Sequence, residues 1–125
     1  MNYIEKVKEF HDAYGVETPQ KPNVDNDELN ELRQALIGEE FDELVEALIV
    51  ADRRLTLDAL CDLQYVLSGA VLALGFAPVF DEAFAEVHRS NMSKLGADGK
   101  PIRREDGKIL KGPNYTPPDL GRFVE

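Results

Sequence analysis

The sequence predicts an all-α protein, a helical bundle of about four helices with an irregular C-terminal tail. Apolar residues recur at helical spacing in four segments before residue 96. From residue 96 onward lie five of the nine glycines and four of the seven prolines, which favour turns and loops. A chain of 125 residues argues for a single domain, 1–125, in which residues 96–125 form the irregular tail.

The first helix is expected at residues 2–14, where apolar side chains line one face and Gly15 can end the helix. A loop with two prolines follows. Asp25 or Asn26 can then cap a second helix that runs to about residue 51. Arg53 and Arg54 come next, and basic residues suit a helix C-terminus.

A third helix is expected at roughly residues 55–74, ended by Gly75. It is apolar almost all round, which is typical of a buried helix. A fourth helix should run from near Pro78 to Leu95. In the tail, the stretch IRREDGKIL has an Asp-Gly turn and predicts a small hairpin.

Composition excludes several classes of protein. With 24 acids against 14 bases the net charge is -10, which argues against nucleic-acid binding and against anionic membranes as partners. A single cysteine, Cys61, excludes a disulfide framework and a cysteine zinc site. The apolar run 59–76 is interrupted by Asp62 and Gln64 and fits a buried helix better than a membrane span. The N-terminus lacks the apolar run of a signal peptide, so we expect a soluble, cytoplasmic protein.

Four carboxylates lie where apolar side chains should be. On the second helix Glu40 falls within the apolar arc and Glu43 lies at its edge; the arc is formed by Leu29, Leu32, Leu36, Leu44, Ala47 and Leu48. On the third helix Asp58 and Asp62 share a face at i and i+4. Antiparallel packing of the two helices would bring these acids together, and buried carboxylates without a partner cost several kcal/mol.

Such a cluster recruits cations or raises its own pKa values. Oxygen ligands favour a hard cation, Mg²⁺ or alternatively Mn²⁺. Iron and zinc are disfavoured because neither His11 nor His88 follows a Glu by three residues. The alternative is that EEFDE is simply a solvated helix face.

Several stretches carry a resemblance to a known superfamily, and they are EFHDAYG, LRQALIGEEFDEL, DALCDLQYVLSGAVLALG and FDEAFAEVHRSNMSK. They resemble the all-α nucleoside triphosphate pyrophosphohydrolases, which include MazG proteins, dimeric dUTPases, dCTP pyrophosphatases and phosphoribosyl-ATP pyrophosphohydrolases. The tail DGKPIRREDGKILKGPNYTPPDL is similar to the ending of the MazG-like branch. The resemblance implies a Mg²⁺-dependent hydrolase that converts a (d)NTP and water to a (d)NMP and pyrophosphate.

The resemblance also assigns roles to residues. It makes Glu40, Glu43 and Asp62 metal ligands and Glu39 the residue that orients or deprotonates the attacking water. The family's second motif usually ends Glu-x-x-Asp, but position 59 here is Ala59. Asp58, one residue earlier, is therefore expected to take the place of the fourth ligand.

The basic residues gather late in the chain, seven of fourteen between Arg89 and Lys111. The family's Asn-x-x-Lys step matches NMSK, which implies that Asn91 and Lys94 bind the substrate. Lys111 and Tyr115 are expected to close over the nucleotide; the alternative is a solvated surface loop. Two questions stay open at this point: whether His11 and Phe10 line a base pocket or only pack, and whether Arg33 balances the acids or reaches a phosphate.

The apolar third helix needs neighbours on all sides, and relatives in this superfamily form dimers or tetramers, so we expect at least a homodimer. Two alternatives to NTP hydrolysis remain. One is a non-catalytic helical interaction module with the same fold, which the substitution at Ala59 favours. The other is phosphoribosyl-ATP hydrolysis, against which the long tail argues.

Overall fold

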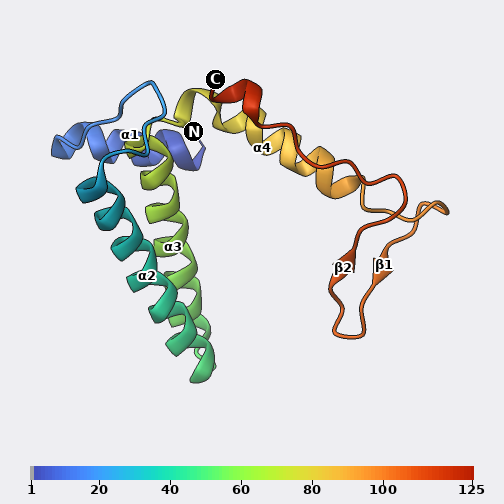
Figure 1. Ribbon diagram of the computed structural model, residues 1–125. Helices are drawn as coiled ribbons and strands as arrows, with labels where there is room; N and C mark the ends of the chain where they lie inside the picture. The colour runs from blue at the N-terminus through green and yellow to red at the C-terminus, as the bar shows by residue number, and fades with distance from the viewer. Residues whose placement is uncertain (1) are drawn as a thin grey trace. The chain divides into compact units, whose positions relative to one another are not determined.

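The computed structural model describes residues 2–125, and these confirm the all-α class (Figure 1). They form four helices: α1 (Tyr3–Tyr14), α2 (Asp27–Ile49), α3 (Arg53–Ala73) and α4 (Ala77–Met92). The expected hairpin is present as β1 (Ile102–Arg103) and β2 (Ile109–Leu110), with Ile102 opposite Leu110 and Arg103 opposite Ile109. A short 3-10 helix, η1 (Gly121–Phe123), lies near the C-terminus.

Side-chain caps explain where the helices begin. Asn26 accepts a hydrogen bond from the Leu29 amide at 3.1 Å, so Asn26 rather than Asp25 caps α2. Asp52 accepts from the Leu55 amide at 2.9 Å and caps α3. The expectation that Arg53 and Arg54 end the second helix is therefore wrong, because the Asp52 cap places both in the first turn of α3.

The chain divides into two compact units, Met1–Pro78 and Val79–Glu125. In the first unit α2 packs antiparallel along α3, and α1 lies across the end of the pair where α2 begins and α3 finishes (Figure 1). Few apolar residues of the described chain are fully buried, and three of them are alanines: the set is Val7, Ala47, Ala59, Leu72 and Ala73. Leu32 and Leu48, expected on the inner face of α2, are half exposed or more in the single chain.

By length and composition α3 could cross a membrane, a test that the core helix of a soluble protein also passes. Two carboxylates, Asp58 and Asp62, lie within the helix, and a charged side chain in a bilayer is costly. The packing of α3 against α1 and α2 gives this helix a role in the core of the first unit.

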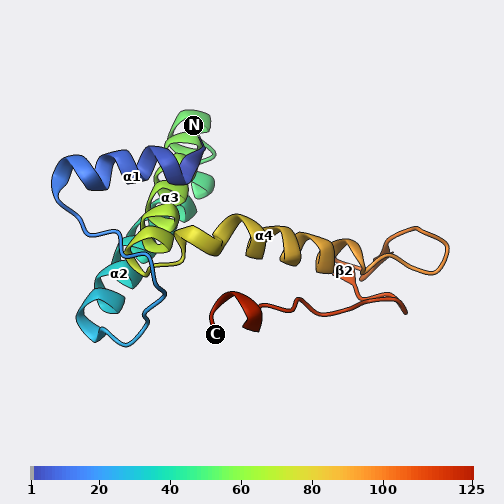
Figure 2. The ribbon, with the colours of Figure 1, turned by 90° about the horizontal axis from the view of Figure 1, so that it is seen from above.

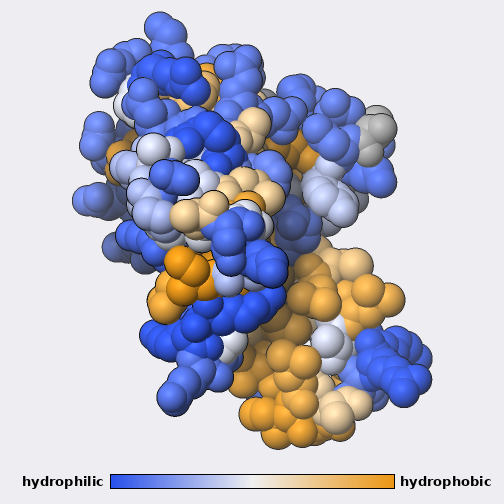
Figure 3. Space-filling model, turned by 90° about the vertical axis from the view of Figure 1, so that its right-hand side faces the viewer, coloured by the Kyte–Doolittle hydropathy of each residue, from blue (hydrophilic) through white to orange (hydrophobic). Residues whose placement is uncertain are grey.

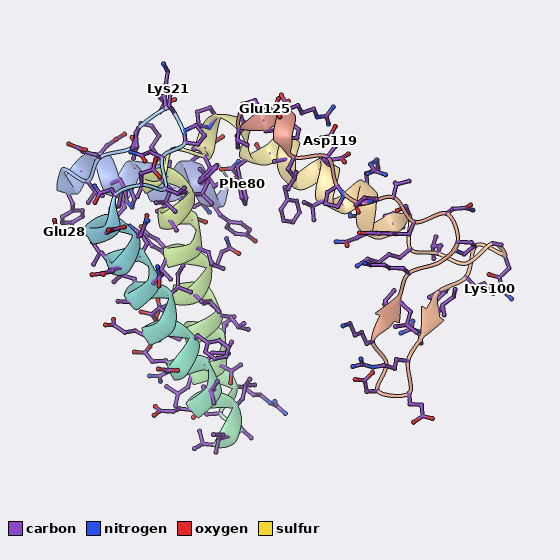
Figure 4. The ribbon with its side chains drawn as sticks, viewed as in Figure 1. Lys21, Glu28, Phe80, Lys100, Asp119 and Glu125 are labelled. Atoms are coloured by element: carbon purple, nitrogen blue, oxygen red, sulfur yellow. The ribbon has the colours of Figure 1, made fainter. Side chains whose placement is uncertain are left out.

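A close backbone approach joins the loop before α2 to the end of α3. Gly75 has a left-handed backbone (φ +82°), and a Cβ there would collide with the carbonyl oxygen of Lys21. Beside it, the Asn23 amide donates to the Leu74 carbonyl at 3.0 Å. Figure 4 shows the Lys21 side chain pointing outward, so it is the backbone of this loop that meets Gly75.

In the second unit the tail returns along α4 (Figure 2). Arg89 pairs with Glu86 and reaches Thr116, while the Asp119 amide donates to Glu86 at 2.7 Å (Figure 4). The buried Ser90 hydroxyl donates to the Thr116 carbonyl at 2.8 Å. The hydrogen bond from Arg89, with that from the Asp119 amide, lowers the pKa of Glu86 to about 2. The tail is thus tied to α4 by charged hydrogen bonds at Arg89 and Glu86 and by neutral hydrogen bonds at Ser90 and Ser93.

Candidate metal centre

Three carboxylates meet in the groove between α2 and α3. One oxygen from each of Glu40, Glu43 and Asp62 lies within 4.8 Å of the others. Glu40 and Glu43 are one helical turn apart on α2, and Asp62 approaches from α3 because the helices run antiparallel. The sequence prediction that acids from two helices converge is therefore met for these three residues.

The charge of Glu40 is not balanced by any basic side chain among the described residues. Glu40 Oε2 is buried without a hydrogen-bond partner among the described residues. Burial raises the pKa of Glu40, and the neighbouring Glu43, Asp62 and Glu39 raise it further. No basic side chain pairs with this cluster in the ion pairs of residues 2–125. An oxygen-only donor set with an orphaned carboxylate oxygen fits a hard divalent cation.

Asp58 lies outside the three-carboxylate cluster. It shares a neighbouring cavity of about 430 Å³ with Glu43 and Glu46, and this cavity is also lined by Ala47 and Ala59. Its role as a fourth ligand stays a prediction. Glu39 is exposed on α2, where its charge still reaches Glu40, and its role towards water likewise stays a prediction.

The predicted substrate-binding residues belong to the second unit. The Gly112 amide donates to the Lys94 carbonyl at 2.8 Å, and a Cβ on Gly112 would collide with the Leu95 carbonyl. This contact brings Lys111 and Tyr115 to the end of α4, with Lys111 Nζ 4.8 Å above the Tyr115 ring. The backbone of Lys94 therefore meets the tail next to Lys111, and Asn91 lies in the last turn of α4.

A further constellation in the first unit was left undecided by the sequence. Arg33 and His11 both lie against Gly69: a methyl group there would be 3.1 Å from Arg33 Nη1 and 3.3 Å from His11 Nε2. Arg33 precedes Glu40 by seven residues, so both lie on the face of α2 that turns to α3. The seven-residue spacing was the signal in the sequence that Arg33 lies on the same helix face as the acids. It does not predict that α1 places His11 beside Arg33.

Comparison with protein families matched residues 7–91, more than half of the chain, to the model described as Phosphoribosyl-ATP pyrophosphohydrolase. The matched segment contains the carboxylate cluster and Asn91 and ends before Lys94. A comparison with curated proteins gave no match.

Proposed function

Because the chain belongs to the phosphoribosyl-ATP pyrophosphohydrolase family, we propose that it hydrolyses a nucleoside triphosphate, ribo or deoxyribo, to the monophosphate and pyrophosphate. Family membership indicates the class, a pyrophosphohydrolase acting on phosphoric anhydrides. The observation that carries the proposal is the partly buried cluster of Glu40, Glu43 and Asp62. A protein of net charge -10 repels a triphosphate unless cations lie between the two.

Glu40, Glu43 and Asp62 would hold the divalent cation, Mg²⁺ or Mn²⁺, with Asp58 as the proposed fourth ligand. When bound, such a cation offsets negative charge on the phosphates and lowers the pKa of water. Glu39 then orients the attacking water and accepts its proton. The water oxygen forms a bond to the α-phosphorus, and the bond from that phosphorus to the bridging oxygen breaks. Pyrophosphate leaves with the electron pair of that bond.

We propose that four residues of the second unit also bind the substrate. Lys94 and Lys111 are proposed to bind phosphate, Asn91 phosphate, sugar or base, and Tyr115 to close over the nucleotide. The hydrogen bond between Gly112 and Lys94 supports a shared role for this group. Positive charge placed against the leaving pyrophosphate stabilises the transition state of such a reaction.

Phosphoribosyl-ATP is the second candidate substrate, favoured by the family match itself. The tail favours a nucleoside triphosphate, because DGKPIRREDGKILKGPNY resembles the MazG-like branch. A non-catalytic module is the remaining alternative and predicts no turnover of any nucleotide.

A panel of ribo- and deoxyribonucleoside triphosphates, together with phosphoribosyl-ATP, tests the proposal in the presence of Mg²⁺. We expect monophosphate and pyrophosphate in equal amounts from at least one triphosphate, measured by chromatography. Turnover of phosphoribosyl-ATP alone would select the second candidate. Release of single phosphates would contradict the reaction class, and no turnover with Mg²⁺ or Mn²⁺ would favour the non-catalytic module.

We also propose that the chain forms at least a homodimer. Leu57, Leu60 and Leu67 follow one face of α3 at helical spacing, and Phe41 and Val45 do so on α2; all five are exposed. Figure 3 shows apolar side chains gathered low on the molecule, at the level of the α2–α3 turn. A second copy would cover such faces.

Light scattering should return at least twice the 14.0 kDa chain mass. We expect Leu60→Lys to shift the protein toward the single-chain mass, because a charge in an apolar interface is costly. A single-chain mass for the unaltered protein at micromolar concentration would contradict the dimer.

A further inference from the structure

Arg33 is a part-buried cation without an anionic partner. Its Nε is buried and makes no hydrogen bond within the described residues. The ion pairs formed by residues 2–125 are Lys8–Asp12, Glu86–Arg89 and Arg104–Asp106, and none includes Arg33. Burial lowers the pKa of Arg33, and no nearby carboxylate opposes that shift. A guanidinium left in this state is costly unless an anion joins it.

His11 adds a second polar group without a partner. Only 3% of the residue is exposed, and its Nδ1 has no hydrogen-bond partner in the described chain. Burial, followed by the charge of Arg33, lowers the pKa of His11, whereas Asp12 acts in the opposite direction. Burial and the charge of Arg33 thus favour the neutral imidazole, which still offers one N–H donor.

Gly69 gives both side chains their room. A methyl group at this position would be 3.1 Å from Arg33 Nη1 and 3.3 Å from His11 Nε2, closer than ordinary packing allows. Three helices thus meet at this point: α1 contributes His11, α2 contributes Arg33, and α3 contributes Gly69.

This pair lies in the same groove as the carboxylate cluster. Arg33 and Glu40 are seven residues apart on one face of α2, an axial separation of about 10.5 Å. Gly69 and Asp62 have the same spacing on α3. Arg33 of α2 therefore lies opposite Gly69, and Glu40 lies opposite Asp62, along the same interface between the two helices. At that separation Arg33 forms no ion pair with the cluster among the described residues. A polyphosphate is long enough to contact both ends.

We propose that Arg33 and His11 form an anion subsite that binds the pyrophosphate portion of the substrate, the part that leaves. The identification of this anion rests on the proposed function. A guanidinium binds phosphate oxygens through two parallel N–H donors, which a buried lysine could not reproduce. The carboxylate cluster and the Arg33–His11 pair then hold the two sides of the bond that breaks.

The stability of a variant that lacks Arg33 distinguishes a ligand-binding role from a purely structural role. If Arg33 only supported the fold, replacing it would lower the stability of the protein. A cation kept for a ligand costs stability in the empty protein, so Arg33→Met should melt at the same temperature as the parent or higher. Arg54→Met, on the exposed start of α3, is the matched control.

The experiment is thermal melting of the intact protein in EDTA, with and without inorganic pyrophosphate. We expect pyrophosphate to raise the melting temperature of the parent and of Arg54→Met. In Arg33→Met the apparent dissociation constant should rise roughly tenfold or more, the effect of losing a charge-assisted hydrogen bond. An equal rise in melting temperature for Arg33→Met, or none for the parent, would overturn the subsite.

Imidazole NMR of the unaltered protein provides a measurement that needs no variant. The chain has two histidines, so only the signals of His11 and His88 are present. Pyrophosphate in EDTA should shift the His11 signals, and the exposed His88 reports general effects of the added anion. Unchanged His11 signals would overturn the proposal. Metal-free binding through Arg33 without turnover of any nucleotide would instead contradict the proposed function alone.

Discussion

Glu40→Gln should lower pyrophosphohydrolase turnover on the order of 10³-fold or more and abolish tight uptake of divalent cation. Glu40 supplies the buried oxygen of the cluster that has no hydrogen-bond partner among residues 2–125. A metal contributes several kcal/mol of charge stabilisation to such a reaction, and each 1.4 kcal/mol is about tenfold in rate. The glutamine keeps the shape of the side chain and removes only the charge.

Turnover of the best substrate and calorimetric titration with Mn²⁺ are the two measurements. Glu31→Gln is the control, since it makes the same change at an exposed site on the same helix. It should leave both quantities unchanged. The metal-free Glu40→Gln protein should fold at least as stably as the parent, because a neutral amide replaces a carboxylate whose charge is disfavoured. Undiminished Mn²⁺ affinity in Glu40→Gln would refute the assigned metal centre.

Gly75→Ala should reduce the free energy of unfolding by on the order of 3 kcal/mol and lower Tm by roughly 10 °C. A left-handed alanine costs about 1–2 kcal/mol. The new Cβ also meets the Lys21 carbonyl, which is backbone and cannot rotate away. The loop must move, and the hydrogen bond from Asn23 to Leu74 is lost with it.

Gly15→Ala separates the cost of a left-handed alanine from the cost of the collision with the Lys21 carbonyl. Gly15 ends α1 with φ +72°, close to the value at Gly75, but a Cβ there would meet nothing within 4 Å. It should cost only about 1 kcal/mol, measured by urea denaturation. Equal losses for the two variants would mean that the close approach of the loop contributes nothing.

The sequence was sufficient to predict the four helices and all three carboxylates of the cluster, although Asp58, predicted beside them, lies outside it. Glu40 and Asp62 stand out because each interrupts an apolar face at helical spacing, and antiparallel neighbours bring such residues together. The inner face of α2 was less well predicted, since Leu32 and Leu48 are apolar yet exposed. Apolar periodicity does not distinguish a face that packs within the chain from one that a second copy would cover.

Other features depend on contacts that no local pattern contains. The start of α3 was placed late because an Asp before two arginines resembles the end of a helix as much as a cap. The role of Arg33 depends on α1, which brings His11 against Gly69 beside it, and no local sequence pattern predicts this contact. The grouping of Lys94 with Lys111 likewise arises from a backbone hydrogen bond at Gly112, which links residues far apart in the chain.

The two buried alanines beside the cluster, Ala47 and Ala59, have a consequence for ion choice. Neither can touch an ion, yet both lie in the seam between α2 and α3, next to Glu43. Methyl side chains allow helix axes to approach to the short end of their usual separation, about 8 Å. If the opposing acids hold a divalent cation, the radius they accommodate would depend in part on these apolar residues, and we expect substitutions at Ala47 or Ala59 to alter the preference among divalent ions without replacing a ligand.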